Sequence, residues 1–443
     1  MPADIVSGCF VGIDLGTSGC RAIAIDDAGA VLGEARAALP ATRQLPDGGR
    51  EQDPDDWWAA VLAVLENLHA QGVGPVAALS VDGTSGSILL CDAAGRPCGP
   101  ALMYDDTRAV SEARRIAGIA PPDSPARGAG SALARLLHLL REAPKAGAHA
   151  MHQADWIAGR LAGHYGESDE NNCLKLGYDP VRRAWPDWLS GLEIPRGLLP
   201  WVRPVGSVLG QIDPALAGRS GLHRGTLVVA GTTDSNAAAL AAGIERPGDA
   251  VTSLGTTLVL KVLAERPVTC GRYGVYSHRI GEHWLVGGAS NSGGGVLRQH
   301  FSDTELAQLS ARIDPERPLG LGYYPLPAEG ERFPRNDPHM VPRMTPRPPD
   351  RAAFLQGLLE GIADIEAEGY ARLGELGAPL PRRVFSAGGG AANPVWERIR
   401  ARRLGVPLLP ARHTEAAYGT ALLARAAATS GAGSIAGSAS DPA

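Results

Sequence analysis

Residues 11–25 read VGIDLGTSGCRAIAI and predict two short apolar strands joined by a turn of glycine, threonine and serine. Glycine lets a backbone approach a ligand closely, and successive turn amides can form a concave anion site, to which Thr17 and Ser18 add hydroxyl donors. Asp14, at the end of the first strand, would repel a phosphate directly, but it can hold a Mg²⁺ that bridges phosphate oxygens. Taken alone, the stretch is explained equally well as a β-hairpin with a polar tip.

The second half of the chain repeats this pattern. Leu-Gly-Thr-Ser at 15–18 returns as Leu-Gly-Thr-Thr at 254–257, and an apolar strand follows each copy. Two related turns, one in each half, predict a duplicated domain that closes on one nucleotide. Between them, residues 228–236 predict a strand that ends in a polar turn with a single acid, Asp234. That position at the end of a buried strand suits a carboxylate that takes a proton from a hydroxyl.

Composition and charge exclude several classes of protein. The 443 residues are enough for two or three domains, and a net charge of -5 with 20% charged residues gives no basic field for nucleic acid or an anionic membrane. No uninterrupted apolar run reaches the length of a membrane span, and the first basic residue is Arg21, so we expect a cytoplasmic protein without a signal peptide. The six cysteines form no Cys-x-x-Cys pair, which predicts reduced thiols rather than a zinc site or a disulfide framework. No lysine follows a glycine, so a Walker-type P-loop is excluded.

Two polar segments in the first half are candidates for sugar binding. A short buried strand at 76–81 runs into Asp82, Thr84 and Ser85, and open α/β sheets place ligands at such strand ends. The segment MYDDTR at 103–108 brings two acids and an arginine together after an apolar entry, which suits hydrogen bonds to several sugar hydroxyls. Its candidate contacts are Asp105 and Arg108. A solvated helix start, capped by one of the acids, explains this second segment equally well.

The strand predicted at 384–387 runs into a glycine turn and then a helix. Three successive glycines, Gly388, Gly389 and Gly390, allow a flat base to lie against bare backbone. A tight connection between a strand and a helix would not need three of them. We therefore expect these glycines, together with Asn393, to line an adenosine pocket.

A break at Pro247-Gly248 divides the two halves of the chain. We expect an N-terminal domain over residues 1–246, which carries the sugar site and the first phosphate turn. A C-terminal domain over residues 247–427 is expected to bind the nucleotide. The Ser/Gly/Ala-rich tail at 428–443 predicts disorder.

Four motifs, taken in order, resemble those of the FGGY carbohydrate kinases, which belong to the actin-like ATPase superfamily. They are Ile13-Asp14-Leu15-Gly16-Thr17-Ser18, Gly231-Thr232-Thr233-Asp234, Leu254-Gly255-Thr256-Thr257 and Gly388-Gly389-Gly390-Ala391-Ala392-Asn393. The resemblance covers about residues 10–425, and residues 104–108 and 331–334 resemble the family's aromatic-x-Asp-x-Arg and Gly-Glu-Arg-x-Pro segments. It implies an α/β fold of two actin-like, ribonuclease H-like domains with an interdomain cleft.

Within the family, the chain looks most like the short D-ribulose kinases of cyanobacteria and plants, which are also labelled xylulokinase-like. The shared segments are 80–85, 152–156, 171–179, 273–279 and 286–291. This likeness implies ATP-dependent phosphorylation of the terminal 5-hydroxyl of a ketopentose, in the first place D-ribulose to D-ribulose 5-phosphate. Xylulokinases usually carry Met-His where this chain has Thr84-Ser85, which favours ribulose over xylulose. The family's C-terminal signature also differs over residues 395–403, so the adenine side of the site is less well defined than the phosphate side.

The resemblance implies roles for the candidate residues. Asp234 is the expected catalytic base, and Asp14 and Asp234 are expected to hold the Mg²⁺ that accompanies ATP. The sugar would contact Asp14, Asp82, Thr84, Ser85, Asp105, Arg108 and Asp234. The nucleotide would contact Gly16, Thr17, Ser18, Gly255, Thr256, Thr257, Gly388, Gly389, Gly390 and Asn393. The expected partners are a pentulose and ATP, with no nucleic acid and no membrane, for a monomer or a homodimer.

Several alternatives share parts of this pattern. A D-xylulose kinase or a polyol kinase would carry the same motifs. A non-catalytic actin-like ATPase, which senses a sugar or forms filaments, would keep the nucleotide turns without transferring phosphate to a sugar. An Hsp70-like nucleotide-binding domain is disfavoured by the acid at Asp234.

Overall fold

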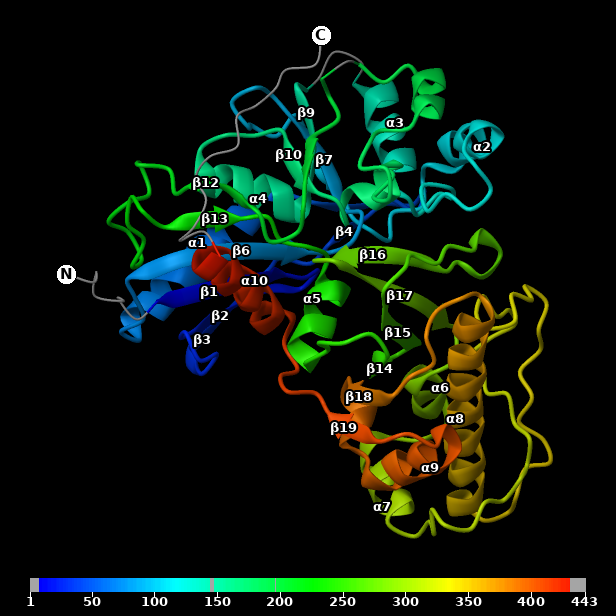
Figure 1. Cartoon of the computed structure of the whole chain (residues 1–443). Coiled ribbons are helices and arrows are strands. Elements are labelled where there is room, and N and C mark those ends of the chain that lie inside the picture. The colour runs from blue at the N-terminus through cyan, green and yellow to red at the C-terminus, as the bar shows by residue number, and fades with distance from the viewer. Residues whose placement is uncertain (1–7, 144–146, 196, 431–443) are drawn as a thin grey trace. The chain divides into compact units, whose positions relative to one another are not determined.

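Figure 1 shows the computed structural model of the chain, which describes residues 8–143, 147–195 and 197–430. The chain forms two compact units. Unit 1 comprises the residues up to 241 together with the segment from 415 onward, and unit 2 comprises residues 242–414. The predicted boundary at Pro247 lies near the first change of unit, and the tail expected at 428–443 lies outside the described residues from 431 onward.

Unit 1 is built on a six-stranded mixed sheet with the order β12-β13-β6-β1-β2-β3 (Figure 1). Its strands are β1 (Cys9–Leu15), β2 (Gly19–Ile25), β3 (Val31–Ala38), β6 (Val76–Gly83), β12 (Val208–Gln211) and β13 (Leu227–Val229). β1, β2 and β3 form an antiparallel meander, as the apolar strands around the first turn predict. β6 runs parallel to β1, and β13 runs parallel to β6. The carboxyl ends of β1, β6 and β13 therefore meet at one edge of the sheet.

Helices and two smaller sheets complete unit 1. The helices are α1 (Pro54–Ala70), α2 (Val110–Ile119), α3 (Ala132–Glu142), α4 (Gln153–Ala162), α5 (Asp234–Ala242) and α10 (Ala416–Ser430). A sheet of order β4-β5-β8-β7-β9 contains β4 (Arg43–Gln44), β5 (Arg50–Gln52), β7 (Ile88–Cys91), β8 (Ala101–Leu102) and β9 (His149–His152). A further parallel pair joins β10 (Glu167–Asp169) to β11 (Trp201–Arg203).

The last helix, α10, packs across β1, β2 and β6 of unit 1. We expected residues up to 427 in the C-terminal domain, so this packing differs from the predicted organisation. Small residues make the close approach feasible: a Cβ added to Gly12 would lie 2.0 Å from the carbonyl oxygen of Ala417. A Cβ on Gly419 would lie 1.9 Å from the carbonyl oxygen of Ala237 on α5. Helix α10 therefore rests directly on the backbone of the strand that precedes the first turn.

Unit 2 repeats the pattern in a sheet of order β16-β17-β15-β14-β18-β19. Its strands are β14 (Asp249–Leu254), β15 (Leu258–Ala264), β16 (Tyr276–Ile280), β17 (His283–Ser290), β18 (Arg383–Ala387) and β19 (Leu408–Pro410). β14, β15 and β17 form the antiparallel meander, whereas β18 runs parallel to β14 and β19 parallel to β18. The helices are α6 (Gly294–His300), α7 (Asp303–Ser310), α8 (Arg351–Glu375) and α9 (Pro394–Leu404). The shared topology confirms the predicted duplication of an α/β domain.

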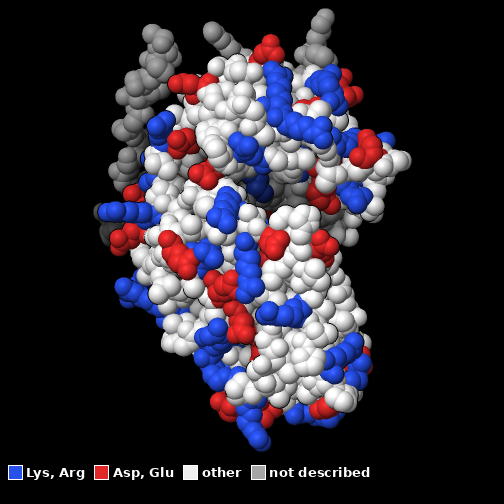
Figure 2. Space-filling model, turned by 90° about the vertical axis from the view of Figure 1, so that its right-hand side faces the viewer, with Lys and Arg blue, Asp and Glu red and all other residues white. Residues whose placement is uncertain are grey.

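Each unit buries its own hydrophobic core. In unit 1, Trp57 of α1 and Trp156 of α4 pack with the apolar face of β1 and β6. In unit 2, Leu358 and Ile362 of α8 pack with Val262 of β15. Figure 2 shows acidic and basic side chains interspersed over the face that it draws, in keeping with the net charge of -5. Among the described residues, no helix is long and apolar enough to span a membrane.

Candidate active site

Two carboxylates face each other where β1 and β6 end. The parallel register pairs Asp14 with Asp82, and side chains at paired positions leave the same face of a sheet. A bridge between Gly83 and Thr233 continues this edge to Asp234, the first residue of α5. Three acids from distant parts of the sequence thus lie at the carboxyl edge of one sheet, where open α/β sheets bind ligands.

Burial raises the pKa of two carboxyls in this acidic cluster. Asp82 is fully buried, and burial together with the charge of Asp14 raises the pKa of its carboxyl well above the usual value. The hydroxyl of Thr420 on α10 donates a hydrogen bond to Asp82 Oδ2. Burial and the nearby charge of Asp234 raise the pKa of Asp14 to about 6, although Arg21 at 3.6 Å favours the ionised form. Burial and mutual repulsion therefore both oppose the simultaneous ionisation of the carboxyls of Asp14 and Asp82.

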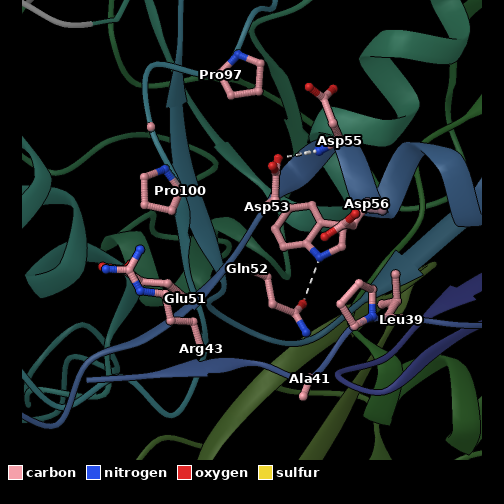
Figure 3. Close-up of a pocket in the computed structure, with 13 residues that line it drawn as sticks. Leu39, Ala41, Arg43, Glu51, Gln52, Asp53, Asp55, Asp56, Pro97 and Pro100 are labelled. Carbon is pink, nitrogen blue, oxygen red and sulfur yellow. Dashed lines mark hydrogen bonds and ion pairs between the residues drawn. The ribbon is translucent and has the colours of Figure 1, made fainter. Parts of the chain in front are cut away.

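A hydrogen-bond relay supports the first turn. Gln52 Nε2 donates to the carbonyl oxygen of Thr17 at 2.7 Å, and Trp57 Nε1 donates to Gln52 Oε1 at 2.8 Å. Figure 3 shows Gln52 among the residues that line a pocket of about 520 Å³ in unit 1. Ser18 is exposed and Thr17 and Gly16 are half-buried, so a ligand can reach all three. The relay fixes the backbone of the turn and leaves both of its hydroxyls accessible.

Thr84 and Ser85, the two predicted sugar contacts in the turn after β6, have different roles. Thr84 is buried, and its amide and hydroxyl both donate to Gln153 Oε1, at 3.0 and 2.8 Å. The hydroxyls of Thr84 and Ser87 lie 2.6 Å apart. Ser85 is only half-buried. Thr84 therefore fixes the conformation of the turn, while Ser85 is the residue that can meet a ligand.

The segment after β8 divides its two acids between different environments. Asp106 is fully buried and accepts from Arg108 at 2.8 Å, and the same guanidinium donates to Glu51 at 2.9 Å. Burial would raise the pKa of Asp106, but hydrogen bonds from Arg108 and from two backbone amides hold it below its usual value. Asp105 is exposed and lies 3.7 Å from Arg50. Of the predicted sugar contacts here, Arg108 is held in an internal ion cluster and Asp105 keeps an accessible carboxylate.

Sequence analysis missed a buried cation that joins these two segments. Arg135, on α3, is fully buried and donates to the carbonyl oxygens of Gly86, Tyr104 and Asp106. Burial lowers the pKa of Arg135 to about 10, which leaves its guanidinium charged at neutral pH. An arginine among the leucines of 133–140 is the only signal that the sequence offers. Arg135 therefore ties the Ser85 turn to the segment that carries Asp105.

Unit 2 contains a pocket of about 710 Å³ beside the second turn. Five of the residues predicted to bind the nucleotide line it: Gly255, Thr256, Gly389, Gly390 and Asn393. Helices α6 and α7 contribute apolar side chains to its lining, among them Leu297 and Leu306. Thr257 and Gly388, also predicted, lie outside the lining. Bare backbone together with apolar side chains suits a flat, largely apolar ring.

At two of the glycines that line this pocket, Gly255 and Gly389, the protein has room for a larger side chain. Gly255 and Gly389 do not have a positive φ, and a Cβ would come no closer than 3.7 Å to any atom at Gly255 and would have nothing within 4 Å at Gly389. Gly388 differs, because its φ is 80° and a Cβ would lie 2.9 Å from the carbonyl carbon of Leu254. A methyl group on Gly255 or Gly389 would thus fit the protein but narrow the pocket, as expected of a nucleotide site.

Asn393 shapes the pocket as the cap of α9. Its Oδ1 accepts the amides of Val395 and Trp396, both at 3.1 Å, and its Nδ2 donates to Ser310 Oγ at 2.9 Å. The predicted adenosine contact therefore uses its carboxamide to hold the start of α9 against the end of α7.

The first residues of α6 support the second turn. The amide of Gly294 donates to the carbonyl oxygen of Gly255 at 2.8 Å, and the amide of Gly295 donates to that of Thr256 at 3.0 Å. Sequence analysis did not assign these glycines to the site. Their amides satisfy the carbonyl oxygens of the second turn and so fix its backbone.

Comparison with known proteins decides the family. The sequence model for the FGGY family of carbohydrate kinases, N-terminal domain, matches residues 9–241, and the model for the C-terminal domain matches residues 250–428. This chain belongs to the FGGY family. It is therefore a phosphotransferase that acts on a small carbohydrate with ATP.

Relatives and solved structures agree with this assignment. The FGGY kinase described here is 26% identical to the xylulose kinase of Escherichia coli over 88% of this chain and 84% of the relative. It is 29% identical to the glycerol kinase of Gloeobacter violaceus over 91% of this chain and 84% of the relative. The structure of xylulose kinase from Rhodospirillum rubrum matches with a TM-score of 0.83 at 26% identity, over 97% of this chain and 91% of that one. The predicted fold of two actin-like α/β domains is confirmed.

The carboxyl edge of unit 1 offers suitable ligands for the Mg²⁺ that FGGY kinases generally use with ATP. Mg²⁺ prefers carboxylate oxygens and takes waters and phosphate oxygens as its other ligands. Asp14 and Asp234 present such oxygens beside the first turn. In the part of the chain that the structure describes, no group of three or more His, Cys, Asp or Glu side chains could hold a metal ion. A magnesium ion at this FGGY site would thus depend on ATP and water for most of its ligands.

Proposed function

We propose that this FGGY kinase phosphorylates the terminal 5-hydroxyl of a ketopentose, with D-ribulose as substrate and D-ribulose 5-phosphate as product. The observation that carries the proposal is the meeting of Asp14, Asp82 and Asp234 at one strand edge, next to the turn at 16–18. Carboxyl groups hydrogen-bond well to sugar hydroxyls, and an ionised one can also accept a proton. The glycine-lined pocket of unit 2 is the proposed site of adenosine.

Asp234 is the proposed catalytic base. It follows β13 and is half-buried, so its carboxylate remains accessible at the strand edge. In phosphoryl transfer the attacking hydroxyl loses its proton late in a loose transition state, so one positioned carboxylate suffices. A Mg²⁺ held by Asp14 and Asp234 would neutralise charge on the phosphate oxygens. The proposed phosphate contacts are Gly16, Thr17 and Ser18 in unit 1 and Gly255, Thr256 and Thr257 in unit 2.

The residues at 84 and 85 support ribulose over xylulose. Thr84 is committed to hydrogen bonds within its turn, and Ser85 offers only a short hydroxyl where xylulokinases usually carry histidine. D-Xylulose is the second candidate, because several relatives of this chain are named xylulose kinase. The two pentuloses differ in configuration at one carbon, so a single hydrogen-bonding group at this turn can discriminate between them.

A coupled assay of ADP release with the full chain and MgATP tests the proposal. D-Ribulose, D-xylulose, ribitol, erythritol and glycerol are each compared with a control without sugar. The proposal expects the highest kcat/KM with D-ribulose. A preference for D-xylulose would select the second candidate, and ADP release that is the same with and without every sugar would contradict sugar phosphorylation.

A further inference from the structure

A fully buried ion pair joins α8 to α9 in unit 2. The side chains of Arg400 and Glu366 are 1% and 0% exposed, and two N–H···O contacts of 2.7 Å hold them together in a bidentate pair. This geometry fixes both side chains in one arrangement. Arg400 lies within residues 395–403, where the sequence departs from the FGGY C-terminal signature.

The pair extends into both strands that carry the turns of the nucleotide pocket. Thr252, on β14, donates to Glu366 Oε1 at 2.6 Å, and the hydroxyl of Tyr370 lies 2.9 Å from that of Thr252. Arg400 Nη1 donates to Ser386 Oγ on β18 at 2.8 Å. All five side chains are buried. The ion pair therefore bridges β14 and β18 through one hydroxyl on each strand.

The bridge lies directly before the two turns. Thr252 and Ser386 are paired in the parallel register of β14 and β18. Gly255 follows Thr252 by three residues, and Gly388 follows Ser386 by two. Trp396, one helical turn before Arg400 on α9, lines the pocket. One network thus touches both turn-bearing strands and the helix that forms a wall of the pocket.

Stability alone is a weak reason for such a network. Desolvation of a buried ion pair can cancel its attraction, and well-packed apolar residues of similar size are often neutral or stabilising replacements. Apolar side chains would fill the same space but would not fix the spacing of two strands through directed hydrogen bonds. We propose that Arg400 and Glu366 are positioning residues that hold the turns at 255–257 and 388–390 in the geometry that binds ATP. This inference rests on the proposed location of adenosine in the unit 2 pocket.

The decisive variant replaces the pair as a whole, Glu366→Leu with Arg400→Met, and leaves no buried charge unpaired. We expect a folded protein whose thermal midpoint stays within a few degrees of wild type, because the two side chains remain well packed. KM for ATP is expected to rise about tenfold, while KM for the sugar changes less than about twofold. Calorimetric titration of the full chain with MgATP should show the same weakening. A pair with a purely structural role would change the midpoint and leave ATP affinity unaltered.

The matched control is an ion pair formed directly between β14 and β18, the two strands that the Arg400–Glu366 pair bridges. Arg383 on β18 binds Asp249 on β14 at 2.7 and 2.9 Å, at the end of the register remote from the turns. Arg383→Met should lower the unfolding midpoint and leave the affinity for MgATP within about twofold of wild type. Weaker ATP binding in Arg383→Met, equal to that of the double variant, would show that the whole sheet matters and would overturn the assignment.

A charge-conserving variant covers the case in which the double variant does not fold. Arg400→Lys keeps the positive charge beside Glu366 but cannot make the bidentate pair and also reach Ser386. We expect it to fold and to bind MgATP several-fold more weakly, and wild-type affinity would contradict the proposal. Direct titration also separates this inference from the proposed function: a wild-type chain that binds MgATP but phosphorylates none of the five sugars refutes only the latter.

Discussion

The turns at 15–18 and 254–257 have nearly the same sequence and the same place in their sheets, but different neighbours. Each follows the first strand of an antiparallel meander and lies beside a parallel strand, β6 in unit 1 and β18 in unit 2. In unit 1 the residue before the turn is Asp14, paired across the sheet with Asp82. In unit 2 the corresponding pair is Ser253 with Ala387.

Charge rather than backbone distinguishes the two copies. A third acid, Asp234, lies five residues after the end of β13. The residue at the same distance after the corresponding strand β19 is also an acid, Glu415, but it belongs to unit 1, where it pairs with Arg21. Ser253 and Ala387 beside the second turn carry no charge, so they would not add the repulsion of a polyphosphate that Asp14 and Asp82 would exert. The acid that lines the pocket beside this turn is Asp303 of α7. The duplicated framework thus supplies both turns, and the residues paired beside them differ in charge, which is what our proposal of a proton-accepting site in unit 1 and an adenosine site in unit 2 requires.

The largest expected effect comes from removing the proposed base, one of the acids that distinguish the strand edge of unit 1 from that of unit 2. Asp234→Asn keeps the shape of the side chain but cannot accept a proton, so kcat should fall by about 10²–10⁴-fold. Sugar affinity should stay within about tenfold, or about 1.4 kcal/mol, because the amide still hydrogen-bonds to hydroxyls. Steady-state kinetics and calorimetric sugar binding measure the two quantities.

A suitable control for Asp234→Asn is Asp55→Asn on α1, which removes an exposed carboxylate that pairs with Arg160. This control should keep kcat within about twofold, because exposed ion pairs contribute little. Retention of most of the turnover by Asp234→Asn would remove this residue from the role of base.

The next prediction compares the first glycine of each turn. Gly16 and Gly255 do not have a positive φ, and a Cβ would lie no closer than 3.5 and 3.7 Å to other atoms. Alanine at either position should therefore leave the free energy of unfolding unchanged or raise it by up to about 1 kcal/mol. Gly255→Ala should nevertheless raise KM for ATP about tenfold, because the methyl group enters the pocket.

Gly388→Ala is the contrasting variant in the same unit. Its φ of 80° and its contact with Leu254 require glycine for the backbone itself, so alanine there should destabilise the protein. If urea unfolding shows equal losses for Gly255→Ala and Gly388→Ala, the glycine of the second turn serves the fold rather than the ligand.

The parts of this site that could be predicted are those encoded locally. Each of these parts is a short continuous stretch of sequence: the Leu-Gly-Thr motif with its flanking strands, which occurs twice, and the glycines at 388–390. Hairpin and turn chemistry therefore suffices to identify them. The duplication can be predicted because the same motif occurs twice, each time followed by an apolar strand. That Asp14 and Asp82 face each other depends on the parallel register of β1 and β6, which pattern alone does not determine.

The residues that could not be predicted act across long separations. Arg135 lies in a leucine-rich helix and Arg400 in an arginine-rich one, and neither has a sequence neighbour that reveals its partner. Arg400 meets Glu366 only because α8 packs against α9. The return of α10 to unit 1 is likewise a tertiary outcome, in which small residues permit contact with β1 but do not specify it.

A smaller effect is expected on the preference between two pentuloses, which tests whether the turn at 84–85 of unit 1 selects the sugar. The double variant Thr84→Met with Ser85→His introduces the Met-His pair that xylulokinases usually carry at these positions. We expect the ratio of kcat/KM for D-ribulose to that for D-xylulose to fall about five- to tenfold, about 1 kcal/mol of discrimination. KM for ATP should not change. The single variant Ser85→Ala controls for loss of the hydroxyl alone, and an unaltered ratio in both variants would place sugar selection elsewhere.

The last prediction concerns Asp249, a buried carboxylate at the amino end of β14, on the same strand as the second turn but remote from it. Burial would raise the pKa of Asp249, but Arg383 and the amides of Glu245 and Arg246 lower it to about 2. Because this folded pKa is below the unfolded value of about 4, its stabilising contribution is present above pH 4 and is lost as pH falls towards 2. Asp249→Asn should therefore lower the free energy of unfolding by about 1–2 kcal/mol at pH 7, and by progressively less below pH 4. Urea unfolding at intervals from pH 2 to pH 7 measures this, and a constant difference between variant and wild type would show that Asp249 does not titrate as described.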